Sequence, residues 1–353
     1  MSEQTEILFE RRGAAGLVTL NRPHALNAVT HGMVRALARQ LGAWADDPAV
    51  TRVVVDAASA RAFSAGGDIR ALYDLGRAGR HDEALAFWRD EYALNATIKR
   101  YRKPYVALID GIVMGGGVGL SVHGSHRVAG DRFAFAMPEV GIGFFPDVGA
   151  TWLLPRLPGE LGTWCALTGE RLVAADAVAA TIATHRVASA RFAELRDALC
   201  GNVSVDALLA AFAEPPTASQ PVARRETIDR LFAGTQVEDI LAALDREGAS
   251  GGPDAAFAAA TAANIRTKSP TSLKLALAQL RAGRSLAFDA CMQTEFRIVS
   301  RIIHGHDFYE GVRAVIIDKN NAPRWQSASL AEVSLAEVER HFAPLATGEL
   351  VLP

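Results

Sequence analysis

Two carboxylates stand in a stretch of the chain that is otherwise apolar. Glu139 and Asp147 lie within AMPEVGIGFFPDVGAT, residues 136–151, among glycine, proline, phenylalanine and small aliphatic residues. Burying an isolated charge is costly, so acids in such surroundings are expected at the surface or in pairs that do chemistry. In an apolar pocket, desolvation and mutual repulsion would raise the pKa of at least one acid. Glycine and proline between the two exclude a shared helix face, so this pairing requires a loop.

Two glycine-rich turns each follow a predicted strand and precede a predicted helix. They are FSAGGD, residues 63–68, and DGIVMGGGVGL, residues 110–120. One such turn alone indicates close packing of a helix on a sheet. Two of them have a sharper interpretation, because glycine and alanine leave backbone N–H groups uncovered and a helix N-terminus favours negative charge. Two N–H groups that converge on one oxygen would form an oxyanion hole, worth about 3 kcal/mol per donor.

Other motifs give weaker indications. GLSVHG at residues 119–124 differs from a G-x-S-x-G nucleophile elbow because His123 takes the place of the last glycine. The run follows a glycine-rich turn instead of ending a strand, so we expect Ser121 to be structural rather than a nucleophile. His123 and His126 are expected to pack or form hydrogen bonds, since no acid or cysteine stands at metal-ligand spacing. No dinucleotide, P-loop or HExxH motif is present, and we expect no bound metal.

Composition narrows the class of protein. Half of the 353 residues are hydrophobic, 22% are charged and the formal net charge is −2, which predicts a large core and no nucleic-acid partner. The three cysteines, Cys165, Cys200 and Cys291, are far apart and without a CxxC motif, which favours reduced thiols. The N-terminal segment is polar and no run of about 18 apolar residues occurs, so we expect neither a signal peptide nor a membrane span. These features together predict a cytoplasmic protein.

The chain divides into two regions. Residues 1–200 alternate strands and helices, which predicts an α/β layer structure. Residues 203–353 are alanine-rich and helical. The first region has predicted strands at residues 7–12, 16–22, 51–58 and 103–111, and helices at 30–44, with Thr30 as N-cap, and 81–99. The second has loops at 214–221 and 247–255, a helix that Ser269 and Pro270 open, and a helix at 285–304 whose apolar residues we expect in the core rather than at an interface.

Several segments together resemble the crotonase (enoyl-CoA hydratase/isomerase) superfamily. They are VTLNRPHALNAV, FSAGGDIRAL, MGGGVGLSVHG and MPEVGIGFFPDVG, and they cover about residues 5–200. Within that superfamily the match is closest to the 3-hydroxyisobutyryl-CoA hydrolase branch. Residues 141–159, 166–172, 183–187, 268–280 and 306–325 carry this second resemblance, which extends it over nearly the full chain.

The resemblance implies roles for particular residues. Ala65 and Gly116 match the backbone donors that hold the thioester carbonyl. Glu139 matches the principal acid–base position and Asp147 matches the second acid of the hydrolase branch. Glu91 matches a substrate-binding acid, although a solvated helix face is the alternative for a residue with charged neighbours. Coenzyme A is expected to lie along the residues His24, Ala25, Ala65, Asp68 and Ile69 as part of the substrate, with no other cofactor.

Departures from the superfamily pattern help to distinguish which of the superfamily's reactions this chain is expected to catalyse. Hydratases of the superfamily carry a second catalytic glutamate where this chain has Gly119, and tend to have glycine where it has Asp147. A hydratase needs one carboxylate to activate water and another to return a proton, so hydratase activity is in doubt. An enoyl-CoA isomerase remains an alternative, as does an acyl-CoA-binding protein without activity. The C-terminal motifs favour the hydrolase.

The resemblance also implies an architecture and a reaction. We expect a β-β-α spiral core of two near-perpendicular sheets, with a C-terminal helical region over the acyl end. We expect hydrolysis of a short 3-hydroxyacyl-CoA, foremost 3-hydroxyisobutyryl-CoA in valine breakdown. Glu139 would either activate a water or attack the carbonyl to form an anhydride, and the sequence leaves both routes open. A homo-oligomer is among the arrangements that the resemblance allows.

Overall fold

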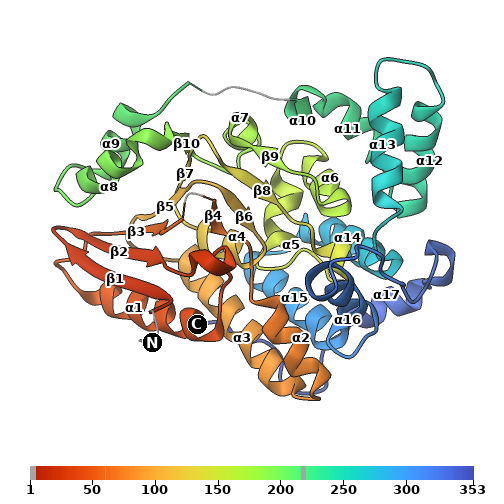
Figure 1. The fold of residues 1–353 in the computed structure, drawn as a ribbon, viewed down its shortest axis with the longest axis horizontal. Helices are drawn as coiled ribbons and strands as arrows, with labels where there is room; N and C mark the ends of the chain where they lie inside the picture. The colour runs from red at the N-terminus through yellow and green to blue at the C-terminus, as the bar shows by residue number, and fades with distance from the viewer. Residues whose placement is uncertain (1–4, 60, 216–219) are drawn as a thin grey trace.

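A six-stranded sheet forms one side of the protein in the computed structural model, which describes residues 5–59, 61–215 and 220–353 (Figure 1). Its strand order is β1-β2-β3-β5-β7-β10, with β1 antiparallel to β2 and every other neighbouring pair parallel. The strands are β1 (Ile7–Arg12), β2 (Ala15–Leu20), β3 (Arg52–Ala57), β5 (Tyr105–Ile109), β7 (His126–Ala129) and β10 (His185–Arg186). The four strands that the sequence predicts in this region are confirmed.

A second sheet of four short strands has the order β4-β6-β8-β9. The strands are β4 (Ala62–Ser64), β6 (Ile112–Met114), β8 (Ala134–Ala136) and β9 (Leu172–Val173). The first three run parallel, while β9 is antiparallel to β8. Hydrophobic periodicity cannot identify strands of two or three residues, so the sequence did not predict them. They determine the site, because the two glycine-rich turns directly follow β4 and β6.

Helices cover both faces of the larger sheet. Val53 and Val55 of β3 pack in the main hydrophobic core with α1 (His31–Asp46), while Val54 between them faces a smaller core with α8 (Phe192–Ala198) and α9 (Val205–Phe212). This alternation is the two-residue period of a strand buried on both faces. Thr30 caps α1 by accepting the N–H of Met33, as predicted. The predicted helix at residues 81–99 is α3 (His81–Lys99).

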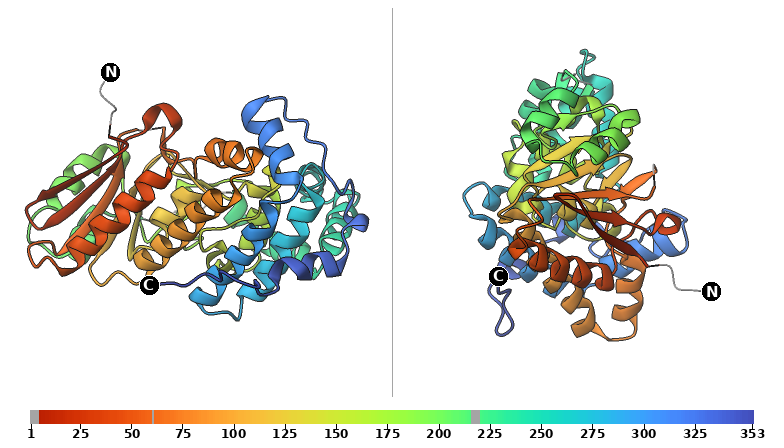
Figure 2. Two further views of the ribbon diagram at one scale, coloured as in Figure 1. Left: turned by 90° about the horizontal axis from the view of Figure 1, so that it is seen from below. Right: turned by 90° about the vertical axis from the view of Figure 1, so that its left-hand side faces the viewer.

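The C-terminal helices pack on this core rather than forming a separate one. Ser269 caps α14 (Pro270–Gly283) as predicted, and the apolar residues of α15 (Phe288–Ile302) belong to the same hydrophobic cluster as the first region. The core interpretation of α15 is thus confirmed, whereas the boundary near residue 200 remains a prediction. The last residues return to α3, where Arg89 donates hydrogen bonds to the carbonyl oxygens of Gly348 and Glu349 (Figures 1 and 2).

The remaining helices surround the second sheet and the C-terminal region. They are α2 (Ile69–Arg77), α4 (Gly116–Ser121), α5 (Ala150–Leu153), α6 (Leu161–Thr168), α7 (Ala174–Ala177), α10 (Gln220–Ala223), α11 (Arg225–Leu231), α12 (Val237–Gly248), α13 (Ala255–Ile265), α16 (Asp307–Val312) and α17 (Leu335–Phe342). The predicted loop at 247–255 is confirmed between α12 and α13, while residues 216–219 of the loop at 214–221 lie outside the described residues. None of the described helices is both long and apolar enough to cross a bilayer.

Candidate active site

Three neighbouring parallel strands deliver the two glycine-rich turns and Glu139 to one place. The chain leaves β4 into the turn at residues 65–67, leaves β6 into Gly115 and Gly116, and leaves β8 two residues before Glu139. The register pairs Met114 with Ala136, so the ends of β6 and β8 lie level. The carboxyl ends of parallel strands meet at the same edge of a sheet. The two glycine-rich turns and the acid of MPEVG therefore face one another.

A cavity of about 400 Å³ lies at this edge. It is mainly apolar, and its polar groups are the amides of the glycine-rich turns, three acids and one lysine. The acids are Glu91, Glu139 and Asp147, so the structure brings together the three that the sequence singled out. The other lining residues are Ala65, Gly66, Gly67, Ile69, Phe87, Trp88, Met114, Gly115, Gly116, Pro138, Gly141, Ile142, Phe144, Lys268, Val315 and Ile316.

The backbone amide of Ala65 is not free to bind a ligand. It donates a hydrogen bond of 3.0 Å to the carbonyl oxygen of Leu26, so its predicted role as a carbonyl donor is wrong. Two residues further on, the amide of Gly67 has no acceptor within the described part of the chain and borders the cavity. The motif indicated the correct turn, but the hydrogen bond between that turn and the segment after β2 decides which amide remains free.

Gly116 lies in close contact with two other parts of the site, the side chain of Glu91 and the turn that contains Gly67. A Cβ added there would lie 2.5 Å from Oε1 of Glu91 and 3.1 Å from the nitrogen of Gly67. As the first residue of α4, Gly116 has an N–H group without an intrahelical acceptor. The free amides of Gly67 and Gly116 are thus neighbours, which is the arrangement that an oxyanion hole requires.

Glu139 and Glu91 are buried acids, each with an oxygen that has no partner. Glu139 begins a 3₁₀ turn, η2 (Glu139–Ile142), and Glu91 lies on α3. Oε2 of Glu139 and Oε1 of Glu91 lack hydrogen-bond partners within the described residues. Burial, followed by repulsion from Asp147, raises the pKa of both well above the ordinary value for glutamate. The solvated-face interpretation of Glu91 is wrong, because this side chain points into the protein and is 1% exposed.

Asp147 lies in the loop between η2 and α5. The hydroxyl of Tyr92 donates a hydrogen bond of 2.8 Å to its Oδ2. Burial raises the pKa of Asp147 to about 7, although the bond from Tyr92 partly offsets this rise by favouring the charged form. The carboxyl group can therefore exchange a proton near neutral pH.

A fourth buried acid, Glu295, stands behind Asp147. It lies on α15, is fully buried and accepts hydrogen bonds from the amides of Gly149 and Thr151. Burial, followed by repulsion from Asp147, raises its pKa to about 8. Sequence reasoning missed this residue, because it is 148 positions from Asp147 in the chain. The sequence did contain one signal for this residue: Glu295 lies among apolar residues of a predicted helix, and we expected those residues in the core.

The C-terminal region also contributes to the cavity wall. Lys268, just before α14, and Val315 and Ile316, in a π-helical segment (η5, Arg313–Ile317), line it. Burial lowers the pKa of Lys268, while Glu170 opposes this effect. The sequence predicted that this region covers the acyl end, but it assigned no individual residue there.

The predicted coenzyme A residues are divided between the cavity and the surface beside it. Ala65 and Ile69 line the cavity, whereas His24, which is exposed, and Ala25, which is half-buried, belong to the 3₁₀ turn η1 (Pro23–Ala25). Asp68 caps α2 and forms an ion pair of 3.0 Å with Arg22. Hydrogen bonds join the segment after η1 to the turn at residues 65–67, so these residues adjoin the cavity. Their contact with coenzyme A remains a prediction.

The weaker motifs prove to be structural. The Ser121 hydroxyl donates to the carbonyl oxygen of Gly117 in its own helix. His123 is hydrogen-bonded to the carbonyl oxygen of Val148, and His126 contacts Ser125 and Asp206. Within the described residues no group of three or more potential metal ligands is arranged to hold an ion. All three cysteines are free, and Cys200 is the one that is partly exposed.

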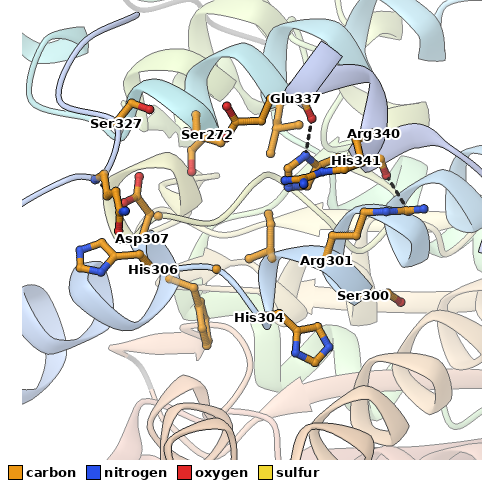
Figure 3. A pocket seen from close by; sticks show the side chains of 17 residues that line it. Ser272, Ser300, Arg301, His304, His306, Asp307, Ser327, Glu337, Arg340 and His341 are labelled. Atoms are coloured by element: carbon orange, nitrogen blue, oxygen red, sulfur yellow. Dashed lines mark hydrogen bonds between the residues drawn. The ribbon is translucent and has the colours of Figure 1, made fainter. Parts of the chain in front are cut away.

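A larger cavity of about 640 Å³ lies among the C-terminal helices (Figure 3). Arg301, His304, His306 and His341 are among its lining residues, and no site residue predicted from the sequence is. Two of these side chains are bonded to backbone carbonyls of the wall: Arg301 to that of His341, and His341 to that of Glu337. None of the buried acids that lack a hydrogen-bond partner among the described residues lines this cavity, and neither Gly67 nor Gly116 does, so the smaller cavity is the candidate active site.

The fold and this site define the class of protein. Residues 15–342 match the family model described as "Enoyl-CoA hydratase/isomerase", and the chain belongs to that family, the crotonase superfamily. A curated relative from Danio rerio, 45% identical over 99% of this chain and 92% of its own length, is named "3-hydroxyisobutyryl-CoA hydrolase, mitochondrial". The relative of the same name from Homo sapiens is 42% identical over 98% of this chain and 90% of its own length.

Solved structures agree on the fold and carry other names. A structure titled as a carnitinyl-CoA dehydratase from Mycobacterium thermoresistibile has a TM-score of 0.92 and 44% identity, over 99% of both chains. One titled as an enoyl-CoA hydratase from Rhodobacter sphaeroides has a TM-score of 0.89 and 39% identity, over 99% of this chain and 100% of its own. The crotonase fold predicted from the sequence is confirmed. Because these names imply different reactions, the chemistry must be argued from the site.

The predicted cytoplasmic location is contradicted by the curated relatives, which are named as mitochondrial. The prediction rested on separated cysteines and on the lack of a long apolar run. Both features are compatible with any compartment that keeps thiols reduced. They do not distinguish one such compartment from another.

Proposed function

We propose that this protein hydrolyses the thioester of a short 3-hydroxyacyl-CoA, with 3-hydroxyisobutyryl-CoA as the preferred substrate. One observation supports this most strongly. Three parallel strands bring two free amides and the unpartnered acid Glu139 to the wall of a single apolar cavity, and α3 adds the unpartnered acid Glu91. The names of the curated relatives point to the same reaction. The product would be a short hydroxy acid, as formed in valine breakdown.

The amides of Gly67 and Gly116 would bind the thioester carbonyl oxygen. As a nucleophile adds, this oxygen gains negative charge, and donors already in place stabilise it without reorganisation. Each donor would contribute about 3 kcal/mol to transition-state stabilisation in a site from which most water is excluded. Coenzyme A would extend from the cavity past Ile69, Lys268 and the predicted surface residues His24, Ala25 and Asp68.

Glu139 would supply the oxygen nucleophile, either directly or through a water that it deprotonates. Its Oε1 lies near the carbonyl site, since a Cβ added at Gly115 would be 3.2 Å away. A pKa raised by burial makes its carboxylate a stronger base than a solvated one. The new carbon–oxygen bond forms first and the carbonyl electron pair moves to the oxygen held by the two amides. The carbonyl then re-forms as the carbon–sulfur bond breaks, and the electron pair of that bond leaves with the coenzyme A thiolate.

Asp147 would transfer the proton that this thiolate needs. With a pKa of about 7 it is partly protonated at neutral pH, and Tyr92 fixes one of its two oxygens. The reaction balances as thioester and water giving carboxylic acid and thiol, with no oxidant or further cofactor. The attacking water gives up one proton, either to Glu139 or when it hydrolyses the anhydride, and this proton restores Asp147 and leaves Glu139 ionised for the next cycle.

Glu91 would recognise the 3-hydroxyl group. Its unpartnered Oε1 is 2.5 Å from a Cβ added at Gly116, so it faces the carbonyl site. A site built to bond a hydroxyl discriminates against an acyl group without one, because the buried acid then stays unpaired. The stacked rings of Trp88 and Phe144, with centroids 5.7 Å apart, form an apolar wall suited to a short branched chain.

The geometry argues against a hydratase. The second glutamate of the hydratase pattern would stand at Gly119, where an added Cβ would lie 2.6 Å from Nδ2 of Asn95 and 2.9 Å from Cβ of Val148. No larger side chain fits there without moving buried neighbours. The two-carboxylate mechanism for adding water to a double bond therefore lacks one of its acids.

Thiol release from four esters tests the proposal. The substrates are 3-hydroxyisobutyryl-CoA, 3-hydroxypropionyl-CoA, isobutyryl-CoA and crotonyl-CoA, followed with a chromogenic disulfide. We expect fast release confined to the two 3-hydroxyacyl esters. Consumption of crotonyl-CoA without free thiol would instead identify a hydratase, and a spectral change of a 3-enoyl-CoA without thiol would identify an isomerase. Tight acyl-CoA binding with no turnover of any ester would identify a binding protein.

A further inference from the structure

The turn that carries Asp147 has a strained backbone. Val148 has a φ of +55° and Gly149 a φ of +90°. A β-branched residue in the left-handed region is a rare outlier. Such strain persists only where the surrounding structure holds it, and it concentrates at functional sites. Something must therefore hold this turn in place.

Glu295 of α15 holds the far side of the turn. Its Oε2 accepts the N–H of Gly149 at 2.8 Å, and its Oε1 accepts that of Thr151 at 2.9 Å. The side chain is fully buried and does not line the cavity. A carboxyl group that accepts one backbone hydrogen bond at each oxygen fixes the spacing of both donors.

Two further buried side chains hold the carbonyl groups on either side of Asp147. Nε2 of Gln279, on α14, donates to the carbonyl oxygen of Pro146 at 2.5 Å. Nε2 of His123, just after α4, lies 2.6 Å from the carbonyl oxygen of Val148. Burial lowers the pKa of His123 to about 4, so the ring is neutral and donates this bond through its Nε2 proton.

These three side chains come from α14, α15 and the turn after α4, which are separate parts of the sequence, and none lines the cavity. They do not touch the place where substrate would lie. Catalytic groups need positions fixed to within about 0.5 Å, which supporting hydrogen bonds provide. Their effect on the reaction must therefore pass through Asp147.

We propose that Glu295, supported by Gln279 and His123, is a positioning residue that holds the strained turn and thereby aims Asp147 at the thioester. The proposal deepens the hydrolase function and rests on it for its kinetic consequence. It assigns a role to a buried acid that the reaction does not use directly.

Glu295→Gln tests this role with little change in volume. The amide keeps one acceptor oxygen but places an NH₂ group against a backbone N–H, so one of the two bonds is lost. We expect kcat for 3-hydroxyisobutyryl-CoA to fall about 10- to 100-fold, because small misplacements of a catalytic group cost that much. KM should change less than about twofold, because the cavity lining is intact. Amide hydrogen exchange over residues 146–151 should become faster.

Thr294→Val is the matched control. Thr294 is the neighbour of Glu295 on the same helix and is also buried, and among the described residues its hydroxyl bonds only to the carbonyl oxygen of Ala290 in that helix. We expect wild-type kcat and wild-type exchange over residues 146–151. A loss of kcat equal to that of Glu295→Gln would show a general effect of disturbing α15, which would overturn the proposal.

A folded Glu295→Gln protein with wild-type kcat and unchanged exchange would also overturn it. If that variant does not fold, Gln279→Leu decides, since it removes the bond to Pro146 from another helix. A lower kcat with unchanged KM supports the proposal, and wild-type values contradict it. The exchange measurement needs no turnover. If the wild type hydrolyses none of the esters, the proposed function fails, while exchange still reports whether Glu295 holds the turn.

Discussion

The hydroxyl of Tyr92 donates a hydrogen bond of 2.8 Å to Oδ2 of Asp147, and both residues are buried. Tyr92 directly follows Glu91 on α3, whereas Asp147 comes from the loop after η2. This hydrogen bond connects Asp147, to which we assign proton transfer, with α3. The same helix carries Glu91, the proposed partner of the 3-hydroxyl group. Recognition of the substrate and the protonation state of Asp147 are thereby linked through one helix.

Tyr92→Phe should raise the pKa of Asp147. The hydrogen bond from Tyr92 favours the charged carboxylate, so its loss favours the protonated form and moves the pKa upward from about 7. A shift of roughly one unit corresponds to a bond of this kind to a charged group. The limb of the kcat–pH profile that belongs to Asp147 should move to higher pH by this amount.

Asp147→Asn identifies that limb, because it should be missing from the profile of this variant. An unchanged profile in Tyr92→Phe would contradict the assignment of the limb to Asp147. A shift to lower pH would show that the hydroxyl stabilises the protonated acid instead.

Glu91→Leu should remove selectivity for the 3-hydroxyl group. Leucine has a similar volume and no acceptor, so the substrate hydroxyl loses its partner. We expect kcat/KM for 3-hydroxyisobutyryl-CoA to fall about 10- to 100-fold, the cost of leaving a buried hydroxyl without its hydrogen-bond partner. The value for isobutyryl-CoA should stay within about threefold. Equal losses on both esters would mean that Glu91 does not recognise the hydroxyl.

Gly116→Ala should abolish turnover. The new methyl group would lie 2.5 Å from Oε1 of Glu91 and 3.1 Å from the nitrogen of Gly67, where the thioester oxygen would bind. We expect kcat to fall at least about 100-fold, comparable to the loss of an oxyanion donor. Gly42→Ala on α1 is the control, because nothing lies within 4 Å of its added Cβ. Turnover by Gly116→Ala close to that of the control would contradict the placement of the carbonyl.

Trp88→Ala should extend the range of acyl chains. The indole stacks on Phe144 and forms part of the apolar cavity wall, so its removal enlarges the space for the acyl group. We expect kcat/KM for a six-carbon 3-hydroxyacyl-CoA to rise relative to the four-carbon ester, measured by thiol release. Its unfolding free energy should fall by about 3–5 kcal/mol, as for other large-to-small core changes. An unchanged ratio would exclude this wall as a limit on chain length.

The sequence predicted the longer elements and the acids well. The strands at β1, β2, β3 and β5 carry clear apolar runs, and the ends of α3 and α14 follow from local patterns. Glu91, Glu139 and Asp147 were found through motifs and do line one cavity. The place of Glu139 could not be derived, because it depends on strands of three residues in the second sheet. Glu91 comes from α3 and Asp147 from a loop, so their convergence with Glu139 depends on tertiary packing.

Two errors of detail have a common cause. The motif FSAGGD identified the correct turn, but the bond from Ala65 to Leu26 leaves Gly67 as the free amide. Glu295 was missed because its partners, Gly149 and Thr151, are distant in the chain. Both features are tertiary hydrogen bonds, which neither composition nor periodicity records.

Thiol release by Glu139→Gln tests the central claim most directly. Glutamine keeps the size of the side chain but can neither attack the thioester carbonyl nor deprotonate a water. We expect kcat for 3-hydroxyisobutyryl-CoA to fall at least about 100-fold, given the usual size of general-base effects, with coenzyme A binding unchanged by calorimetry. A variant that keeps more than about a tenth of the wild-type rate would contradict the role of Glu139 and with it the proposed mechanism.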